Sequence, residues 1–316
     1  MSSEKDINLN EEGKMNLDLT TKKKVSKKTI KKYLFVARML IIALLNIAIF
    51  YFYVNFKSII MAFKIDGEAG FTLYHFKTFI SELTKADSTI FKALLNTMIF
   101  FVNSIAIIFP LSLLLSYFIY KKIRCYKIFR VIFFIPGIIS SVVLVIVYKN
   151  FIVPMGPFGQ ILNAFGVECP HWFADSRYAK WAIVLYCIWT GLGGNMILFG
   201  GAMARIPDEI VEAATLDGVG TFRELTQVVI PLIWSTICTL LVFTIVGIFT
   251  ASGPILLFTQ GEYDTYTISF WIFQQIERGY DPNYPSAVGL FFTLIGTPIV
   301  LISKHYLEKI GSDVEY

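Results

Sequence analysis

The sequence predicts an all-α, polytopic membrane protein with six transmembrane helices, and three observations support this fold class. Of 316 residues, 55% are hydrophobic and only 16% are charged, whereas soluble domains carry about 25% charged residues. The mean hydropathy is +0.63. The apolar residues are gathered into runs that match the ~20 residues that a membrane-spanning helix needs. The six runs cover residues 34–56, 93–120, 131–148, 181–203, 228–251 and 286–303.

The first apolar run is interpreted as a retained membrane anchor. It exceeds the roughly 7–15 apolar residues of a signal peptide, and no small-x-small cleavage motif stands at its end, where the sequence is Tyr53-Val54-Asn55-Phe56. Residues 1–33 before it are polar and basic, with few aromatic side chains in the first 21. This composition predicts a disordered tail, because such a segment has little apolar surface to bury.

The distribution of Lys and Arg predicts the orientation. Short loops rich in these residues stay in the cytoplasm. Lysines precede the first span, and five basic residues fill the short loop at 121–130. Six spans place both segments on one side, so we expect both termini, the C-terminal tail at 306–316 and the loop at 204–227 to be cytoplasmic. The basic tail is expected to set topology and to contact anionic lipid headgroups, and no nucleic-acid partner is predicted.

The polar side chains give no sign of catalysis or metal binding. Cys125, Cys169, Cys187 and Cys238 show no C-x-x-C spacing, and three histidines are scattered. We therefore predict no catalytic residue and no metal ligand. The chain has no G-x-x-x-x-G-K-[ST] sequence, so it is not expected to bind ATP through a Walker loop. The spans hold almost no ionisable residues, which argues against a proton relay.

A charged segment between the fourth and fifth apolar runs predicts a short helix. Pro207 suits a first helical turn, because its missing N–H has no helical partner there. Asp208 and Glu209 place negative charge at the positive end of the helix dipole. Gly218 is expected to end the helix in a left-handed conformation.

A second short helix is predicted directly after it. Thr221 and Glu224 form a T-x-x-E sequence, which is typical of a capping box at a helix start. Pro231 marks where this helix gives way to the fifth span. A plain connection would need only a few residues, so two capped helices on the cytoplasmic side indicate a contact with a partner.

These residues resemble a known family. Glu212-Ala213-Ala214, then Gly218, and nine residues later Val228-Val229-Ile230-Pro231-Leu232, is similar to the EAA loop of the integral membrane subunits of ABC importers. The segment Ile206–Gly218 resembles Ile-Pro-x-Glu-x-x-Glu-Ala-Ala-x-x-Asp-Gly of the sugar-importing, maltose-transporter branch. Further similar segments are Phe129–Pro136, Trp189-Thr190-Gly191 and Tyr284–Leu290, whereas residues 253–268 depart from the pattern of that branch.

The resemblance implies a type I ABC importer permease fold, with a core of five helices at 90–305 after the first transmembrane helix at 34–56. It implies that the loop at 204–227 is a coupling helix that docks on an ATPase. In that loop, the implied anchor is Glu212, the close-packed face is Ala213 and Ala214, and the bend is Asp217 and Gly218.

The same resemblance implies the partners and the location. We expect a second homologous permease subunit, a dimer of ATP-binding cassette ATPases and an extracellular solute-binding protein. ATP and Mg²⁺ are then used by the ATPase, and this chain binds no cofactor. The implied location is a bacterial cell membrane, crossed several times.

The solute is expected to be a carbohydrate, and specifically an oligosaccharide. Neutral hydrogen-bonding and aromatic side chains inside the spans suit an uncharged polyol, although the same residues also serve hydrogen bonding between helices. The candidate pathway residues are Asn103, Trp189, Asn195, Thr244 and Thr250. A permease for glycerol phosphate or a polyamine, an ion-coupled carrier and a membrane scaffold remain alternatives.

Overall fold

The computed structural model describes residues 27–65, 70–249 and 254–311, with side chains from residue 31 onward. Of the tail that was predicted to be disordered, residues 1–33, residues 1–26 lie outside the described ranges, whereas residues 27–33 are helical. All secondary structure in those ranges is helical, which confirms the predicted all-α class for the described part of the chain. The chain divides into two units, Met1–Lys57 and Ser58–Tyr316, which are considered separately.

The first unit carries one long helical segment. It consists of α1 (Lys27–Asn46) and a π-helical stretch, η1 (Ile47–Tyr53), followed by α2 (Val54–Ala62), which continues past the unit boundary. Residues 31–62 are long and apolar enough to cross a membrane. The helix begins at Lys27, ahead of the predicted boundary at residue 34, because lysine is a good helix former and extends the apolar helix into the basic tail.

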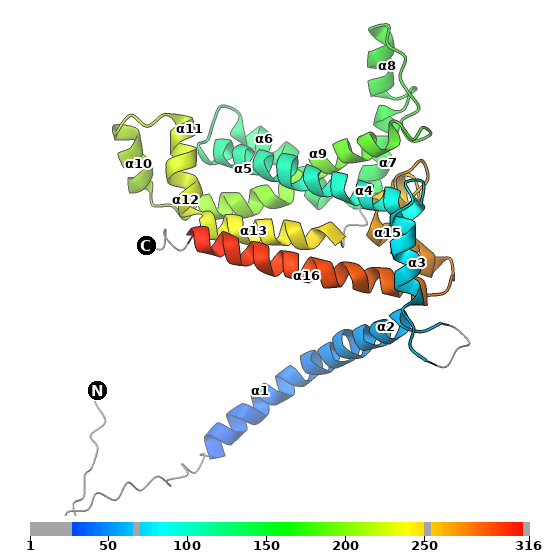
Figure 1. Ribbon diagram of the computed structural model, residues 1–316. Helices are drawn as coiled ribbons and strands as arrows, with labels where there is room; N and C mark the ends of the chain where they lie inside the picture. Colours follow the sequence, from blue (N-terminus) through cyan, green and yellow to red (C-terminus); the bar gives the residue numbers. More distant parts are fainter. Residues whose placement is uncertain (1–26, 66–69, 250–253, 312–316) are drawn as a thin grey trace, which may run out of the picture. The chain divides into compact units, whose positions relative to one another are not determined.

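The second unit is a set of packed helices. Figure 1 shows α5, α9, α13 and α16 running side by side, with α10 and α11 at one end and α3 and α15 at the other. Its elements are α3 (Tyr74–Leu83), α4 (Thr89–Val102), η2 (Asn103–Ile108), α5 (Phe109–Tyr120), α6 (Tyr126–Ile138), α7 (Ser141–Ile152), α8 (Pro157–Ala164), α9 (Ala179–Met203), α10 (Asp208–Leu216), α11 (Thr221–Glu224), η3 (Leu225–Val229), α12 (Ile230–Leu232), α13 (Trp234–Val246), η4 (Gly247–Phe249), α14 (Ile255–Phe258), α15 (Ile268–Glu277) and α16 (Asn283–Gly311).

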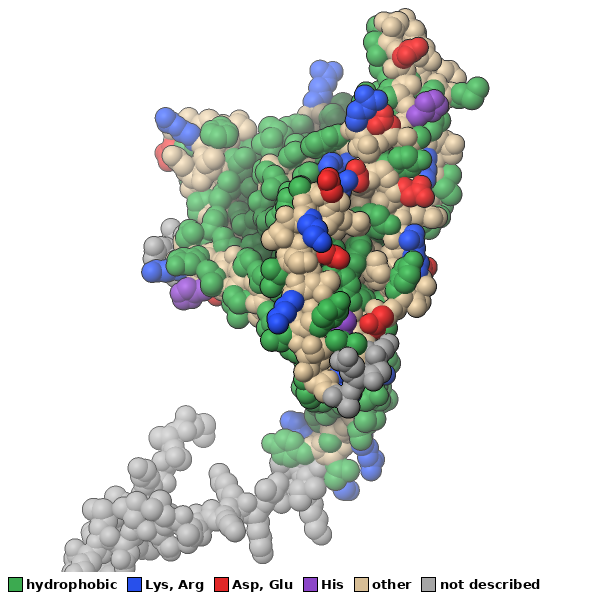
Figure 2. Space-filling model, turned by 45° about the vertical axis from the view of Figure 1, so that its right-hand side comes forward, with side chains coloured by type: hydrophobic (Ala, Val, Ile, Leu, Met, Phe, Trp, Pro, Cys, Tyr) green, Lys and Arg blue, Asp and Glu red, His purple; other side chains and the backbone are tan. Residues whose placement is uncertain are grey.

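The described helices fit the predicted number of spans. Five are long and apolar enough to cross a membrane, and a sixth results if the bent pair at 221–249 counts as one span. Large apolar side chains such as Leu114, Leu198 and Leu294 are exposed on the flanks of the second unit. Figure 2 shows a mainly hydrophobic flank, whereas charged side chains gather over the end that carries α3 and α15. This distribution is that of a surface facing lipid, with polar groups at its end.

The third predicted span, 131–148, is not a single helix. The chain forms α6 and α7, with Ile139 and Ser140 in extended conformations between them. Pro136 lies inside the last turn of α6 and lacks an N–H, so the helix is weakened just before the break. The prediction of one continuous helix there was wrong, because a continuous apolar run does not show a break in the backbone.

The fifth predicted span is strongly bent. Residues 221–232 and 234–249 meet at 80°, with Ile233 at φ −103° and ψ 14° between them. The π-helical η3 lies just before Pro231, as η2 lies just before Pro110. A widened turn accommodates proline, because the ring otherwise clashes with the carbonyl four residues earlier.

A close crossing of α6 and α9 leads to a stability prediction. A Cβ added at Gly193 would lie 2.5 Å from the Phe133 carbonyl oxygen, whereas a Cβ at Gly194 meets nothing within 4 Å. Gly193→Ala should therefore lower stability by about 1–3 kcal/mol, the usual cost of overpacking. Gly194→Ala, the matched control, should be neutral or gain up to ~1 kcal/mol from helix propensity. Thermal unfolding of the purified protein in detergent measures both, and equal midpoints would contradict the crossing.

Candidate functional site: the two-helix element and the cavity between the spans

Helix α10 forms as its sequence predicts. Pro207 lies just before the helix at φ −58° and ψ 135°, and Asp208 and Glu209 occupy the first turn. Pro207 is thus the N-cap residue and not the first helical residue. Gly218 follows the helix at φ +72°, a left-handed conformation that glycine adopts without strain. The Val219 N–H donates to the Ala214 carbonyl at 3.1 Å, which completes the helix end.

The five residues of the predicted coupling site lie on and after α10. Glu212, Ala213, Asp217 and Gly218 are exposed, whereas Ala214 is buried. Ala214 therefore packs within the chain, and Ala213 faces outward. The carboxylates of Glu212 and Asp217 are free to meet an external surface, since neither forms an ion pair with another described residue.

The predicted capping box at the start of α11 was wrong. Gly220 is the N-cap residue and no side-chain cap bond forms. The Glu224 side chain instead turns to α5, where both carboxylate oxygens accept from the Lys121 Nζ at 2.9 Å. Lys121 at the end of a separate span offers a stronger partner than a local N–H, because the bond is charge-assisted.

This ion pair is a functional candidate that the sequence did not reveal. The Glu224 side chain is only 4% exposed and that of Lys121 is 29% exposed. Removing one partner of a fully buried pair costs about 3–5 kcal/mol of stability. Because Lys121 is partly exposed, the cost for this pair is about 3 kcal/mol or less. The Tyr117 hydroxyl adds a hydrogen bond to the Thr221 carbonyl at 3.1 Å.

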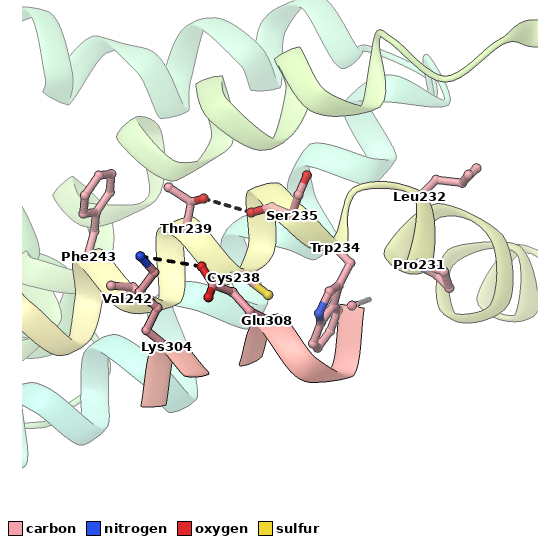
Figure 3. A pocket seen from close by; sticks show the side chains of 11 residues that line it. Pro231, Leu232, Trp234, Ser235, Cys238, Thr239, Val242, Phe243, Lys304 and Glu308 are labelled. Atoms are coloured by element: carbon pink, nitrogen blue, oxygen red, sulfur yellow. Dashed lines mark hydrogen bonds and ion pairs between the residues drawn. The ribbon is translucent and has the colours of Figure 1, made fainter. Parts of the chain in front are cut away.

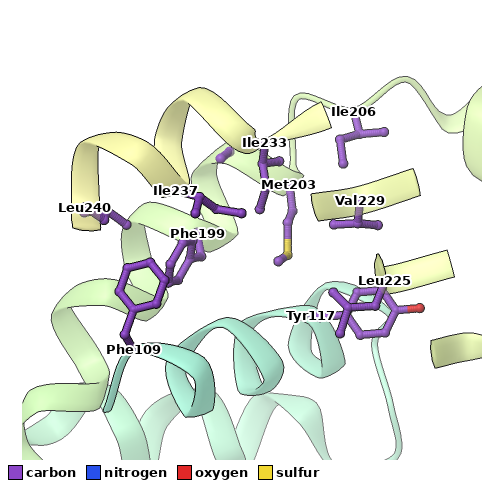
Figure 4. Close-up of a cluster of buried hydrophobic side chains, with 11 residues drawn as sticks. Phe109, Tyr117, Phe199, Met203, Ile206, Leu225, Val229, Ile233, Ile237 and Leu240 are labelled. Carbon is purple, nitrogen blue, oxygen red and sulfur yellow. The ribbon is translucent and has the colours of Figure 1, made fainter. Parts of the chain in front are cut away.

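A buried apolar cluster joins three spans to the two-helix element, which consists of α10 and α11 and is represented at the cluster by Val211 of α10. Figure 4 shows its side chains converging from α5, α9, η3 and α13. Phe199, Met203 and Val229 are fully buried in it, and Phe109 packs edge-on against Phe199 with ring centroids 5.3 Å apart. The element therefore has a fixed place on the spans and does not hang from them as a loose loop.

Helices α13 and α16 also contact each other at the same end of the unit. A cavity of about 740 Å³ opens there, lined by Trp234, Cys238 and the ion-paired Lys304 and Glu308 (Figure 3). The Trp234 indole donates to the Leu307 carbonyl at 3.1 Å. This bond fixes the last turns of α16 against α13.

The structure brings two of the predicted pathway residues together. Asn195 and Thr244 line one cavity of about 270 Å³ between η2, α9, α13 and η4. Its other walls are hydroxyl, aromatic and aliphatic side chains, and none of the described lining residues is Asp, Glu, Lys, Arg or His. The lining residues are Thr97, Phe100, Phe101, Ser104, Ile108, Gly191, Asn195, Thr244, Gly247, Ile248 and Thr267.

The other three pathway residues have different positions. Trp189 lines a separate, almost wholly apolar cavity with Tyr148 and Phe151. Asn103 is 4% exposed, and neither side-chain polar atom has a hydrogen-bond partner among the described residues. Thr250 lies outside the described residues.

Three polar side chains at the other end of the unit make hydrogen bonds between segments that the sequence did not predict. Thr97 accepts from the Ile268 N–H at 3.0 Å, and Asn96 donates to the carbonyls of Asp264 and Tyr266. Lys149 on α7 donates to the Leu257 carbonyl at 2.9 Å and lies over the rings of Phe173 and Phe258. The Lys149 ammonium therefore has structural partners.

The fold and the two-helix element define a multi-pass α-helical membrane protein of the permease class. Residues 88–310 match the family described as binding-protein-dependent transport system inner membrane component, and the chain belongs to that family. This confirms the family suggested by the EAA-like sequence.

Relatives within this family carry names of sugar transport systems. The chain is 28% identical over 216 residues to the lactose transport system permease protein LacF of Rhizobium radiobacter, covering 66% of this chain and 72% of the relative. It is 26% identical over 283 residues to the polygalacturonan/rhamnogalacturonan transport system permease protein YteP of Bacillus subtilis (strain 168), covering 84% and 85%.

Solved structures share the fold. A chain of a bacterial ABC transporter involved in the import of the acidic polysaccharide alginate superimposes with a TM-score of 0.78 at 25% identity, covering 90% of this chain and 98% of that one. A bacterial alginate ABC transporter in complex with an alginate pentasaccharide-bound periplasmic protein gives a TM-score of 0.79 at 24% identity, with the same coverage.

Proposed function

We propose that this chain is the permease subunit of an ATP-driven importer that moves an oligosaccharide across a bacterial cell membrane. In this proposal the chain catalyses no reaction. A separate dimeric ATPase hydrolyses ATP with Mg²⁺, a second homologous permease completes the pathway, and an extracellular solute-binding protein delivers the sugar.

The observation that carries the proposal is the attachment of α10 and α11 to the spans. Glu212 on α10 and Asp217 directly after it are exposed. Glu224 and the buried cluster hold the base of the element to α5, α9 and α13. Coupling of ATP hydrolysis to transport requires a surface that an external partner can move and that is fixed to the spans.

The proposed orientation places this element in the cytoplasm. The basic loop at 121–130 lies at the same end as α10, since Lys121 contacts α11. Basic short loops favour the cytoplasmic side. The same orientation gives cytoplasmic termini if the spans number six.

A neutral carbohydrate fits the cavity better than the alternative solutes. The described lining offers hydroxyl, amide and aromatic groups and no charge, whereas glycerol phosphate or a polyamine would require opposite charges to replace its hydration. The relative LacF is named for lactose, a neutral sugar, whereas YteP is named for polygalacturonan and rhamnogalacturonan, whose galacturonate units carry carboxylates. These names support a carbohydrate as the solute, and the choice of a neutral one rests on the cavity lining alone.

The proposal predicts a stable complex and ATP-dependent uptake. Affinity purification of the chain from its native membrane should yield an ATP-binding cassette ATPase and a second permease. Proteoliposomes of that complex, supplied with the solute-binding protein, should take up labelled sugars only with ATP. The panel should contain lactose, neutral oligosaccharides, galacturonan oligosaccharides, glycerol 3-phosphate and putrescine. Absence of an ATPase, or uptake driven by an ion gradient alone, would refute the proposal.

The bend after α10 gives a sharper prediction. Gly218→Val should leave insertion intact, because a Cβ at this position meets nothing within 4 Å. It should still uncouple transport, since valine is strained at φ +72° and the bend must change. Gly218→Asn is the matched control, because asparagine tolerates the left-handed conformation. Given a strain of about 1–3 kcal/mol, sugar uptake per copy of the protein in the membrane should fall roughly tenfold or more for Gly218→Val and far less for Gly218→Asn. Normal uptake by the Val variant would contradict the proposed role of the bend.

A further inference from the structure

We propose that Lys121 and Glu224 are positioning residues that make the cytoplasmic end of α5 move together with α11. This inference rests on the proposed function, because it assumes that an ATPase displaces the two-helix element. It adds a specific path by which that displacement reaches the cavity.

The contact between α5 and α11 consists of two separate interactions. Tyr117 and Lys121 lie four residues apart on one side of α5, and they contact Thr221 and Glu224, three residues apart on α11. The Lys121 Nζ is 2.9 Å from both carboxylate oxygens. Two contacts about one turn apart on each helix fix direction as well as distance.

The burial of this pair separates it from the other ion pairs of the described residues. In each of the other three pairs, at least one side chain is more than 40% exposed, and such pairs contribute little. Glu224 is almost completely buried, and a buried charge resists separation from its partner because it would be left uncompensated. We therefore expect the end of α5 and α11 to move together, with the contact between them intact.

The middle of the same helical span lines the cavity. The segment α4–η2–α5 is one span from Thr89 to Tyr120. Ser104 and Ile108 on η2 line the cavity that holds Asn195 and Thr244. A displacement applied at Lys121 is thus transmitted along α5 to the π-helical η2, which forms part of the cavity wall.

The test uses the full complex with the ATPase and the second permease, with Cys125, Cys169, Cys187 and Cys238 replaced. Nitroxide labels are attached at Phe222 on α11 and Val102 on α4, which are 75% and 58% exposed. Distances are measured by pulsed electron paramagnetic resonance with and without MgATP and vanadate. The compared variants are Glu224→Gln, Lys121→Met, the charge swap Lys121→Glu/Glu224→Lys and, as the exposed-pair control, Lys304→Met.

We expect the wild-type label distance to stay the same on vanadate trapping, because α11 moves together with the whole span α4–η2–α5. In Glu224→Gln and Lys121→Met the distance should shift or broaden only after trapping. Sugar taken up per ATP hydrolysed, measured with the panel sugar that the wild-type complex transports fastest, should fall by roughly 2- to 30-fold. The charge swap should recover most of this loss, and Lys304→Met should behave as wild type.

The inference would be overturned by single variants with wild-type distances and ratios, by a charge swap as impaired as the single variants, or by a wild-type distance that changes on trapping. Because uptake per ATP is independent of the amount of protein, reduced abundance alone does not mimic the effect. A single variant that loses the ATPase altogether also counts against it, since the pair would then act in assembly. If the wild-type complex lacks an ATPase, the proposed function fails, which is a different outcome.

Discussion

The arrangement depends on one buried contact, the apolar cluster that holds three spans and the two-helix element together. Phe199 and Met203 of α9 and Val229 of η3 are fully buried in it. The chain leaves the spans after α9 and returns through η3 to α13. The cluster lies at the base of this segment and holds its two ends together. Without the cluster, α10 would be tethered only by flexible connections. The ion pair between Lys121 and Glu224 adds a polar, directional contact to an otherwise non-directional apolar one.

Two irregular stretches of the spans lie next to the candidate functional features. The π-helical η2 borders the cavity, η3 precedes the 80° bend at Ile233, and each is followed by a proline. In lipid, unpaired backbone groups are costly, so irregular backbone is tolerated where it is buried in protein or lines a cavity. The positions of Pro110 and Pro231 thus determine where the spans can widen and turn.

Much of this fold follows from the sequence, and the exceptions have physical reasons. Apolar runs identify the spans because lipid selects for them, and the Pro207–Gly218 segment identifies α10 because its end signals are local. The break at Ile139 was not predicted, since an apolar run carries no mark of a change in backbone conformation. Glu224 was misread as a capping residue because its true partner, Lys121, is 103 residues away. Asn195 and Thr244 were predicted by residue type, but their shared cavity depends on how α9 and α13 pack.

The central claim is that the exposed surface of α10 meets the ATPase. Site-specific cross-linking tests it most directly: a cysteine at Leu216, which is 88% exposed on α10, is compared with one at Phe165, which is 81% exposed after α8. With a short homobifunctional reagent and surface cysteines introduced on the ATPase, the account predicts a cross-linked permease–ATPase band for the Leu216 variant alone. A band formed equally well from Phe165, or none from any position on α10 in an intact complex, would contradict the account.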